Sequence, residues 1–89
     1  MFPGFIKIAD VKLEMGNFAK SIRKREKISQ QALADRLNIS RLTIQNMEAG
    51  RNFTIDTFLL VMEHFQMLHA LNRWFKERRL EQEDLKSLY

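Results

Sequence analysis

One stretch decides the fold: SQQALADRLNISRLTIQNMEAG, residues 29–50. Ser29 and Ser40 are good helix N-caps, because a serine hydroxyl accepts a hydrogen bond from a backbone N–H that the first helical turn leaves unpaired. Asn38 stands where the first helix must end, and asparagine is one of the few residues besides glycine that tolerate a left-handed backbone. We therefore expect two short helices joined by a tight turn, over residues 30–37 and 41–48.

The apolar residues of these two predicted helices recur at helical spacing. Leu33 and Leu37 share one face of the first helix, and Ile44 and Met47 share one face of the second. The rest of the second helix is mostly polar and carries long side chains, and Gly50 supplies the backbone freedom that ends it. This pattern is typical of a helix-turn-helix whose second helix enters the major groove of DNA.

The motif resembles the helix-turn-helix of the phage repressor/Cro family, which includes xenobiotic-response-element-like regulators. The matching runs are residues 29–34, 39–44 and 47–51, within a match over residues 22–58. The resemblance implies an all-α, five-helix repressor-like bundle that binds DNA. It also implies an ion pair between Arg23 and Glu48, which stand at the family's paired positions. Where the family usually has a glycine that ends the first helix, this chain has Lys27. We therefore expect either a lysine with a left-handed backbone conformation, at a cost of about 1 kcal/mol, or a turn of different shape.

Composition favours a single small globular domain. The 89 residues are 45% hydrophobic and 29% charged, which suits one modest core. Cysteine is absent, which excludes disulfides and thiolate metal sites and favours a cytoplasmic protein. No apolar run has the form of a secretion signal or a membrane span, so no membrane partner is expected. Because no phosphate-binding glycine loop or carboxylate pair is present, and His64 and His69 do not share a helix face, we predict no enzyme, cofactor or metal.

Charge is unevenly distributed along the chain. The formal net charge is +4, and residues 15–28 hold five basic side chains against one acidic one. Residues 54–72 hold two acidic side chains and no lysine or arginine. A basic run is usually only a solvated helix face. Beside a helix-turn-helix, however, it favours a polyanionic partner, and we expect double-stranded DNA.

The expected organisation has three parts. Residues 1–14 form an N-terminal arm of irregular structure or a short strand, residues 15–66 the DNA-binding domain, and residues 67–89 a C-terminal helix and tail. Helices are predicted over residues 17–27, capped by Asn17, and over residues 55–65, capped by Thr54. Phe18, Ala19 and Ile22 are predicted to form the buried stripe of the first of these. We expect a bend at Gln66, a fifth helix from residue 67, and a short helix or frayed tail over residues 78–89.

The second helix of the motif holds the candidate base contacts. Arg41 has the fork that binds guanine O6 and N7 together, and Gln45, one turn later, has the amide that reads adenine in the same bidentate way. Leu42 suits contact with a thymine methyl group, although a minor core contact is the alternative. Asn46 is assigned either to a base or to the sugar-phosphate backbone of the DNA. The predicted base contacts are therefore Arg41, Leu42, Gln45 and Asn46.

Phosphate contacts fix the position of such a domain on the duplex. Gln30 opens the first helix of the motif, where the helix dipole already favours an anion. In the family, the matching glutamine binds phosphate and also braces the recognition helix. The full set of predicted phosphate contacts is Gln30, Gln31, Ser40, Thr43, Arg51 and Asn52.

One domain of this size reaches only a few base pairs, so we expect a homodimer that reads an inverted-repeat operator as a repressor. The apolar residues of the fifth helix are candidate dimer or partner contacts: Met67, Leu71, Trp74 and Phe75. The alternative is an antitoxin, since similar domains occur in proteins that neutralise a toxin partner and repress their own operon. A third hypothesis is a purely structural helical adaptor, in which case replacing Arg41 and Gln45 leaves DNA affinity unchanged.

Overall fold

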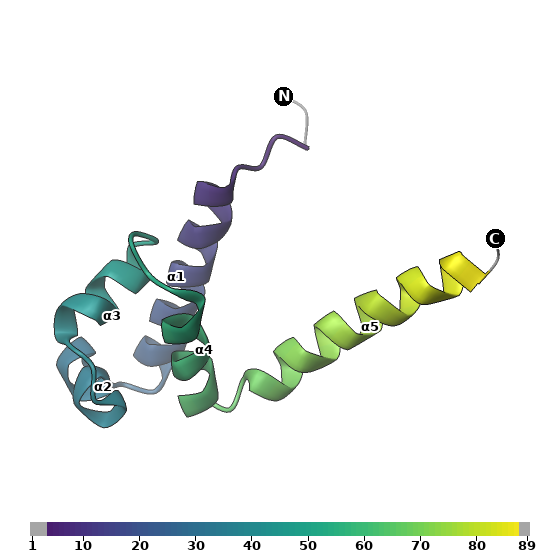
Figure 1. Ribbon diagram of the computed structural model, residues 1–89. Coiled ribbons are helices and arrows are strands. Elements are labelled where there is room, and N and C mark those ends of the chain that lie inside the picture. The colour runs from purple at the N-terminus through teal and green to yellow at the C-terminus, as the bar shows by residue number, and fades with distance from the viewer. Residues whose placement is uncertain (1–3, 88–89) are drawn as a thin grey trace.

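The computed structural model describes residues 4–87, with side chains through residue 84. This part of the chain contains five helices and no strand, so the predicted all-α, five-helix fold is confirmed. The helices are α1 (Ile8–Arg25), α2 (Gln30–Leu37), α3 (Arg41–Glu48), α4 (Ile55–His64) and α5 (Leu68–Ser87). Figure 1 shows α1 to α4 gathered into a bundle, while α5 leaves it on the side opposite α3.

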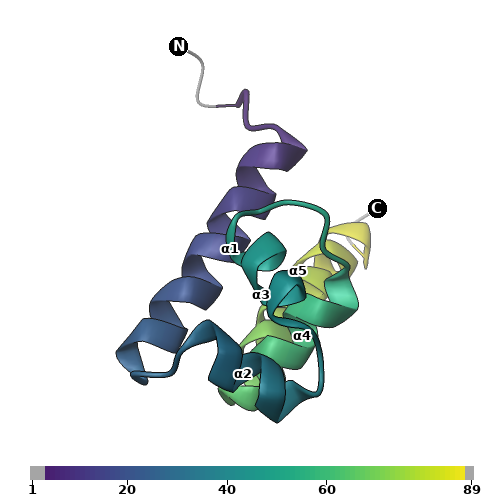
Figure 2. The same cartoon turned by 90° about the vertical axis from the view of Figure 1, so that its left-hand side faces the viewer.

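The buried core draws on the first four helices. α3 packs against α1, α2 and α4, and the view in Figure 2 also places it among these three. The fully or nearly fully buried hydrophobic residues are Ala19, Ile22, Leu33, Ala34, Ile44, Met47, Phe58, Val61 and Met62. Because α3 contributes Ile44 and Met47 to this core, its inner face is fixed and its outer face is left to solvent.

The helix-turn-helix has the predicted bounds, caps and turn. The Ser29 hydroxyl accepts a hydrogen bond from the Ala32 N–H at 3.0 Å, and the Ser40 hydroxyl accepts one from the Thr43 N–H at the same distance. Asn38 is left-handed, with φ 56°, between the two helices. Lys27 is also left-handed, with φ 58°, so the first of the two alternatives for that turn is correct. Thr54 caps α4 as predicted, and that helix ends one residue earlier than expected.

The N-terminal prediction was wrong, because α1 begins at Ile8 and not at residue 17. The Lys7 backbone N–H donates to Asp10 Oδ2 at 2.9 Å, which closes the first turn, and Asn17 lies inside the helix. Residues 8–14 are therefore helical, and the boundary drawn after residue 14 falls within α1. Phe18 is exposed rather than buried, since the inner face of the longer helix passes through Met15, Ala19 and Ile22.

Gly16 lies inside α1 where that helix crosses the end of α3. A Cβ atom on Gly16 would lie 2.6 Å from the Glu48 carbonyl oxygen, closer than side chains approach backbone atoms. One turn earlier, Leu13 Cα lies 2.8 Å from the position that a Cβ on Gly50 would take. These two glycines let α1 and the end of α3 approach closely, and Gly50 also adopts φ 71° to end α3.

The close approach at Gly16 makes Gly16→Ala destabilising. We expect a loss of about 1–3 kcal/mol in the free energy of unfolding, because the added methyl group meets backbone atoms that cannot rotate away. Denaturant titration followed by circular dichroism measures the loss. Gly4→Ala is the matched control, since nothing lies within 4 Å of a Cβ at Gly4. Equal stability of the Gly16→Ala variant and the unaltered protein would contradict the close crossing.

α5 is one continuous helix as far as Ser87, so the separate terminal helix or tail from residue 78 was wrong within the described residues. Residues 88–89 lie outside them. Two ion pairs between adjacent turns support the distal part of α5. They join Arg78 to Glu81 and Arg79 to Glu83, both at 2.8 Å. The predicted bend before α5 is confirmed, because Gln66 is left-handed with φ 59°.

Candidate nucleic-acid interface

The outer face of α3 carries the four predicted base-contact residues. Ile44, Met47 and Glu48 are buried on the inner face. Arg41 and Leu42 are exposed, the latter at 62%, while Gln45 and Asn46 are half-buried at the surface. A leucine this exposed is not a core residue, which removes the structural alternative for Leu42. No hydrogen bond or ion pair engages the side chains of these four residues within the described chain, so their polar groups remain available to a ligand.

The two residues that the resemblance pairs, Arg23 and Glu48, form a buried ion pair. Arg23 Nε donates to Glu48 Oε2 at 2.6 Å and Nη2 donates to Oε1 at 2.9 Å, so the contact is bidentate. Arg23 Nη1 donates to the Ile28 carbonyl oxygen at 2.8 Å. The hydrogen bonds to Glu48 raise the pKa of the Arg23 guanidinium above its ordinary value, so the guanidinium stays protonated.

Gln30 joins this pair from the start of α2. Its Nε2 donates to Glu48 Oε1 at 3.0 Å, so that one carboxylate receives hydrogen bonds from both α1 and α2. Both carboxylate oxygens are therefore satisfied by protein donors, which a buried charge requires. The network ties the last turn of α3 to the two preceding helices. It thereby fixes how the outer face of α3 is presented.

Apart from Gln30, whose amide donates to Glu48, the predicted phosphate contacts fall into two structural groups. Gln31, Ser40 and Thr43 already have partners: Gln31 Nε2 donates to Asp35 Oδ1 at 2.9 Å, and the two hydroxyls hydrogen-bond each other at 2.7 Å. Arg51 and Asn52 lie exposed in the loop after α3, and Asn52 is left-handed with φ 47°. Within the described part of the chain, neither loop side chain has a hydrogen bond or ion pair. The two loop side chains are therefore more available to a phosphate than those of the first group.

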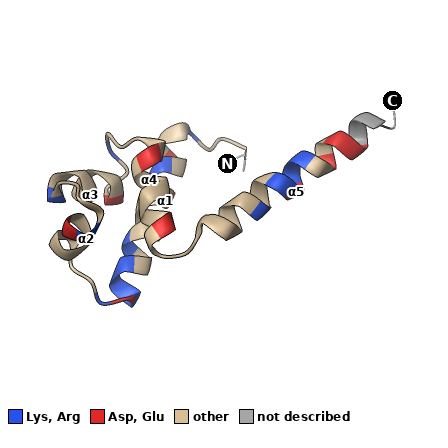
Figure 3. Ribbon diagram, turned by 60° about the horizontal axis from the view of Figure 1, so that its bottom comes forward, with Lys and Arg blue, Asp and Glu red and all other residues tan. Residues whose placement is uncertain are grey.

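Basic side chains cluster at the C-terminal end of α1. Lys20, Lys24 and Arg25 are exposed there, six residues or fewer before the turn at residues 26–27 that leads to Gln30. Figure 3 shows this end of α1 in blue, and it shows a second mixed run of blue and red along α5. The positive potential predicted from the sequence thus lies beside the start of α2.

The four candidate dimer or partner residues divide between core and surface. Met67 and Leu71 are half-buried and pack against the core, whereas Trp74 and Phe75 are exposed. The Trp74 and Phe75 rings meet edge to face at 5.0 Å, and the Arg78 guanidinium lies 5.8 Å from the Trp74 ring centre. Exposed aromatic residues of this kind are enriched at the centres of protein interfaces.

Sequence reasoning missed two features near this site. Gly16, which lies just before the predicted helix start at residue 17, is the contact point of α1 with α3. Ile8 and Val11, interpreted as part of an arm, extend the apolar stripe of α1 through Met15. The signal was present, because these three residues are spaced three and four apart as on a helix.

The comparisons with known proteins agree with this geometry. A family model described as helix-turn-helix matches residues 20–69. No curated protein matches the chain. Within the described part of the chain, none of the helices combines the length and the hydrophobicity that a membrane span needs. The match spans more than half of the chain and contains the Arg23–Glu48 pair, both helices of the motif and α4. The chain therefore belongs to the repressor/Cro-type helix-turn-helix family and is a DNA-binding transcriptional regulator.

Proposed function

We propose that the protein is a repressor that binds an inverted-repeat operator as a homodimer, with α3 in the major groove. One observation carries this proposal: four side chains suited to base contact lie on the outer face of α3, and a buried network holds that helix in place. A site that reads bases must be held rigidly, since small displacements break bidentate hydrogen bonds. The Arg23–Glu48–Gln30 network supplies this rigidity.

Base recognition follows from the chemistry of each side chain. Arg41 binds guanine, Gln45 binds adenine, and Leu42 packs on a thymine methyl group. Asn46 reaches a base or the sugar-phosphate backbone beside them. In this assignment each half-site contains at least one guanine and one adjacent A·T pair. Two such half-sites lie about one helical turn apart, because a two-fold axis relates the two copies of α3.

Phosphate contacts from both ends of α3 position the helix in the groove. Arg51 and Asn52 follow its C-terminal end, while Ser40 and Thr43 stand at its N-terminal end. Gln30 and Gln31 add the positive end of α2. The basic end of α1 supplies attraction at longer range, which strengthens binding to any DNA sequence.

Selection of bound sequences from random DNA, at a fixed salt concentration, tests the proposal. We expect enrichment of inverted repeats whose half-sites contain the predicted guanine. Enrichment of single half-sites would contradict the dimer but leave the base contacts standing. Binding that falls steeply with salt and prefers no sequence would contradict sequence-specific repression, because only the phosphate contacts would then operate.

A further inference from the structure

The loop between α3 and α4 is fixed by hydrogen bonds at its two ends. At its start, the Arg51 N–H donates to the Asn46 carbonyl oxygen at 2.8 Å, which ties the loop to the last turn of α3. At its other end, Thr54 caps α4. Within the described chain, no hydrogen bond engages Asn52 or Phe53 between these points. The middle of the loop therefore depends on packing for its position.

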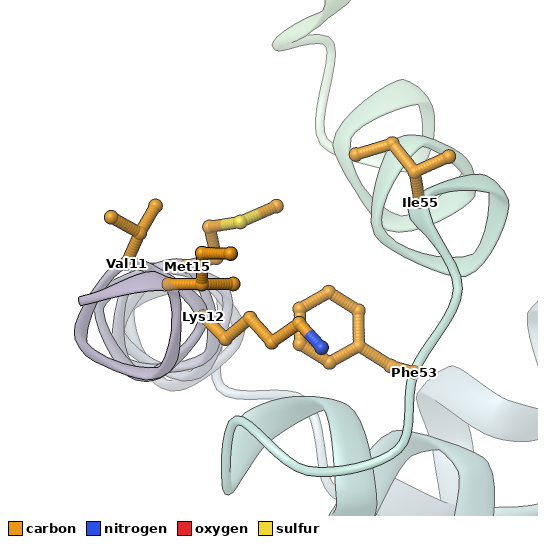
Figure 4. Close-up of a pocket in the computed structure, with 6 residues that line it drawn as sticks. Val11, Lys12, Met15, Phe53 and Ile55 are labelled. Carbon is orange, nitrogen blue, oxygen red and sulfur yellow. The ribbon is translucent and has the colours of Figure 1, made fainter.

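The N-terminal half of α1 lies against this loop. The two backbones meet directly, because a Cβ atom on Gly50 would lie 2.8 Å from Leu13 Cα and 3.1 Å from the Lys12 carbonyl oxygen. Lys12 and Met15 also face Phe53 across a hollow of about 340 Å³, and Figure 4 shows both side chains projecting from α1 toward the Phe53 ring. In Figures 1 and 2 the loop accordingly starts beside α1 and passes from there to α4.

The part of α1 that meets the loop is not needed for the hydrophobic core. The first fully buried hydrophobic residue of α1 is Ala19, and the apolar residues within the range 8–13 are all exposed. This range also precedes residue 20, where the match to the family begins. The extension of α1 thus does not complete the bundle, and its close backbone contact is with Gly50 at the start of the loop.

We propose that residues 8–13 of α1, here called the α1 brace, hold Arg51 and Asn52 in position to bind DNA phosphate groups. This inference rests on the proposed function, which assigns the phosphate contacts to these two loop residues. It adds Lys12 and Leu13 as positioning residues, which act through the loop and need not touch the DNA.

A loop held in place binds phosphate more tightly than a loop that must be ordered on binding. Fixing the backbone of a residue costs free energy, and the cost is avoided where the free protein already holds the bound conformation. Arg51 and Asn52 are exposed and their side chains have no hydrogen bond or ion pair within the described chain, so neither holds itself in place. Phosphate contacts carry no sequence information. The α1 brace should therefore strengthen binding to every DNA sequence alike.

Glu14→Pro removes the α1 brace and leaves the rest of α1 able to fold. Proline drives the residue before it out of the helical conformation, so the turn through Leu13 is lost. Proline is also well accepted as the first residue of a helix, so α1 can begin at residue 14 and keep Ala19 in the core. Glu77→Pro is the matched control, because Glu77 is likewise exposed, lies on α5 and carries the same charge.

Hydrogen exchange of the free protein tests the α1 brace without DNA. In Glu14→Pro the Arg51 amide should exchange about tenfold faster, because the loop opens more often once α1 no longer supports it. Glu77→Pro should leave this rate unchanged. The amide of the core residue Ile44 reports global unfolding separately. If circular dichroism shows that Glu14→Pro is unfolded, Leu13→Gly takes its place, since it weakens the helix at the same turn without a proline.

DNA binding at several salt concentrations tests the consequence for function. Glu14→Pro should bind the selected operator and unrelated DNA about tenfold more weakly, with the preference between them unchanged. The plot of log affinity against log salt should become shallower by about one unit, as for one lost phosphate contact. Losing the Glu14 carboxylate would by itself strengthen binding to a polyanion. Weaker binding therefore cannot come from the change in charge, and Glu77→Pro should show none.

A double-variant comparison shows whether the α1 brace acts through the loop. In a chain that carries Arg51→Ala and Asn52→Gly, the phosphate-binding side chains are gone, while glycine still accepts the left-handed conformation of residue 52. Adding Glu14→Pro to this chain should weaken DNA binding by about twofold or less, because there is no contact left to position. A loss equal to that in the unaltered loop would mean that Glu14→Pro acts elsewhere.

Three results would overturn the proposal: an unchanged exchange rate of the Arg51 amide, equal weakening of DNA binding by Glu77→Pro, or full additivity with the loop variant. The proposed function fails separately. Faster exchange at Arg51 in a protein that prefers no DNA sequence would contradict the function alone. Unchanged exchange and unchanged affinity in Glu14→Pro, with the operator preference intact, would contradict this inference alone.

Discussion

Glu48→Ala is expected to destabilise the protein by about 3–5 kcal/mol, the usual cost of removing one partner of a buried ion pair. Domains of this kind are stable by only about 5–15 kcal/mol, so a large part of the stability would be lost. The physical reason is the Arg23 guanidinium. The Arg23 side chain is only 9% exposed, and its guanidinium would keep only the Ile28 carbonyl oxygen as an acceptor, while Gln30 would lose its partner as well.

Urea or guanidinium titration measures this loss, with Glu83→Ala as the matched control. Glu83 forms an ion pair with Arg79 at 2.8 Å on the exposed surface of α5, where such pairs contribute about 0–1 kcal/mol. A double variant, Arg23→Met with Glu48→Leu, should recover much of the stability, since it leaves no charge without a partner. If Glu48→Ala cost no more than Glu83→Ala, the network would not be the element that holds α3.

Simultaneous replacement of Arg41 and Gln45 by alanine should abolish most of the sequence preference on DNA. Each bidentate base contact contributes about 1–3 kcal/mol of discrimination, so the two together should reduce the preference by about 2–6 kcal/mol. Stability should change little, because neither side chain takes part in a hydrogen bond or ion pair within residues 4–84. Affinities for the selected operator and for unrelated DNA, measured at the same salt concentration, give the preference directly.

Arg73→Ala is the control for the lost charge, since Arg73 is exposed on α5, away from α3. It should lower the affinity for all DNA slightly and leave the preference for the operator intact. The base-contact assignment would be wrong if the double variant weakened binding to every sequence equally. Unchanged DNA affinity in the double variant would instead favour the structural-adaptor hypothesis.

The sequence predicted the central part of the fold well because its determinants there are local. A serine cap and the residues it serves lie within one helical turn, as at Ser29 and Ser40, so the sequence alone reveals the helix start. Asn38 and Gly50 end their helices through their own backbone preferences. The role of Glu48 was different, since only the resemblance pointed to a partner 25 residues away.

The two ends of the chain were predicted less well, for a different reason at each end. Gly16 signals a helix break on propensity, but it is accommodated inside α1 because the end of α3 occupies the space of a side chain. The distal half of α5 resembles a tail by composition, yet ion pairs such as Arg79–Glu83 accompany a continuous helix. At Gly16 a tertiary contact decides the structure. Along α5 the supporting pairs are local, at i,i+3 and i,i+4 spacing, and residue order reveals them where composition does not.

By itself, the sequence determined the helix-turn-helix and the chemistry of its outer face, because caps, spacing and side-chain type act within a few residues. Only the tertiary structure decided that α1 extends to Ile8, that it crosses α3 at Gly16, and that an apolar groove lies between Met15 and the α5 residues Trp74 and Phe75. These features depend on how distant segments approach one another. A close crossing needs a missing side chain at one exact point, and a groove needs two helices that diverge from a shared base.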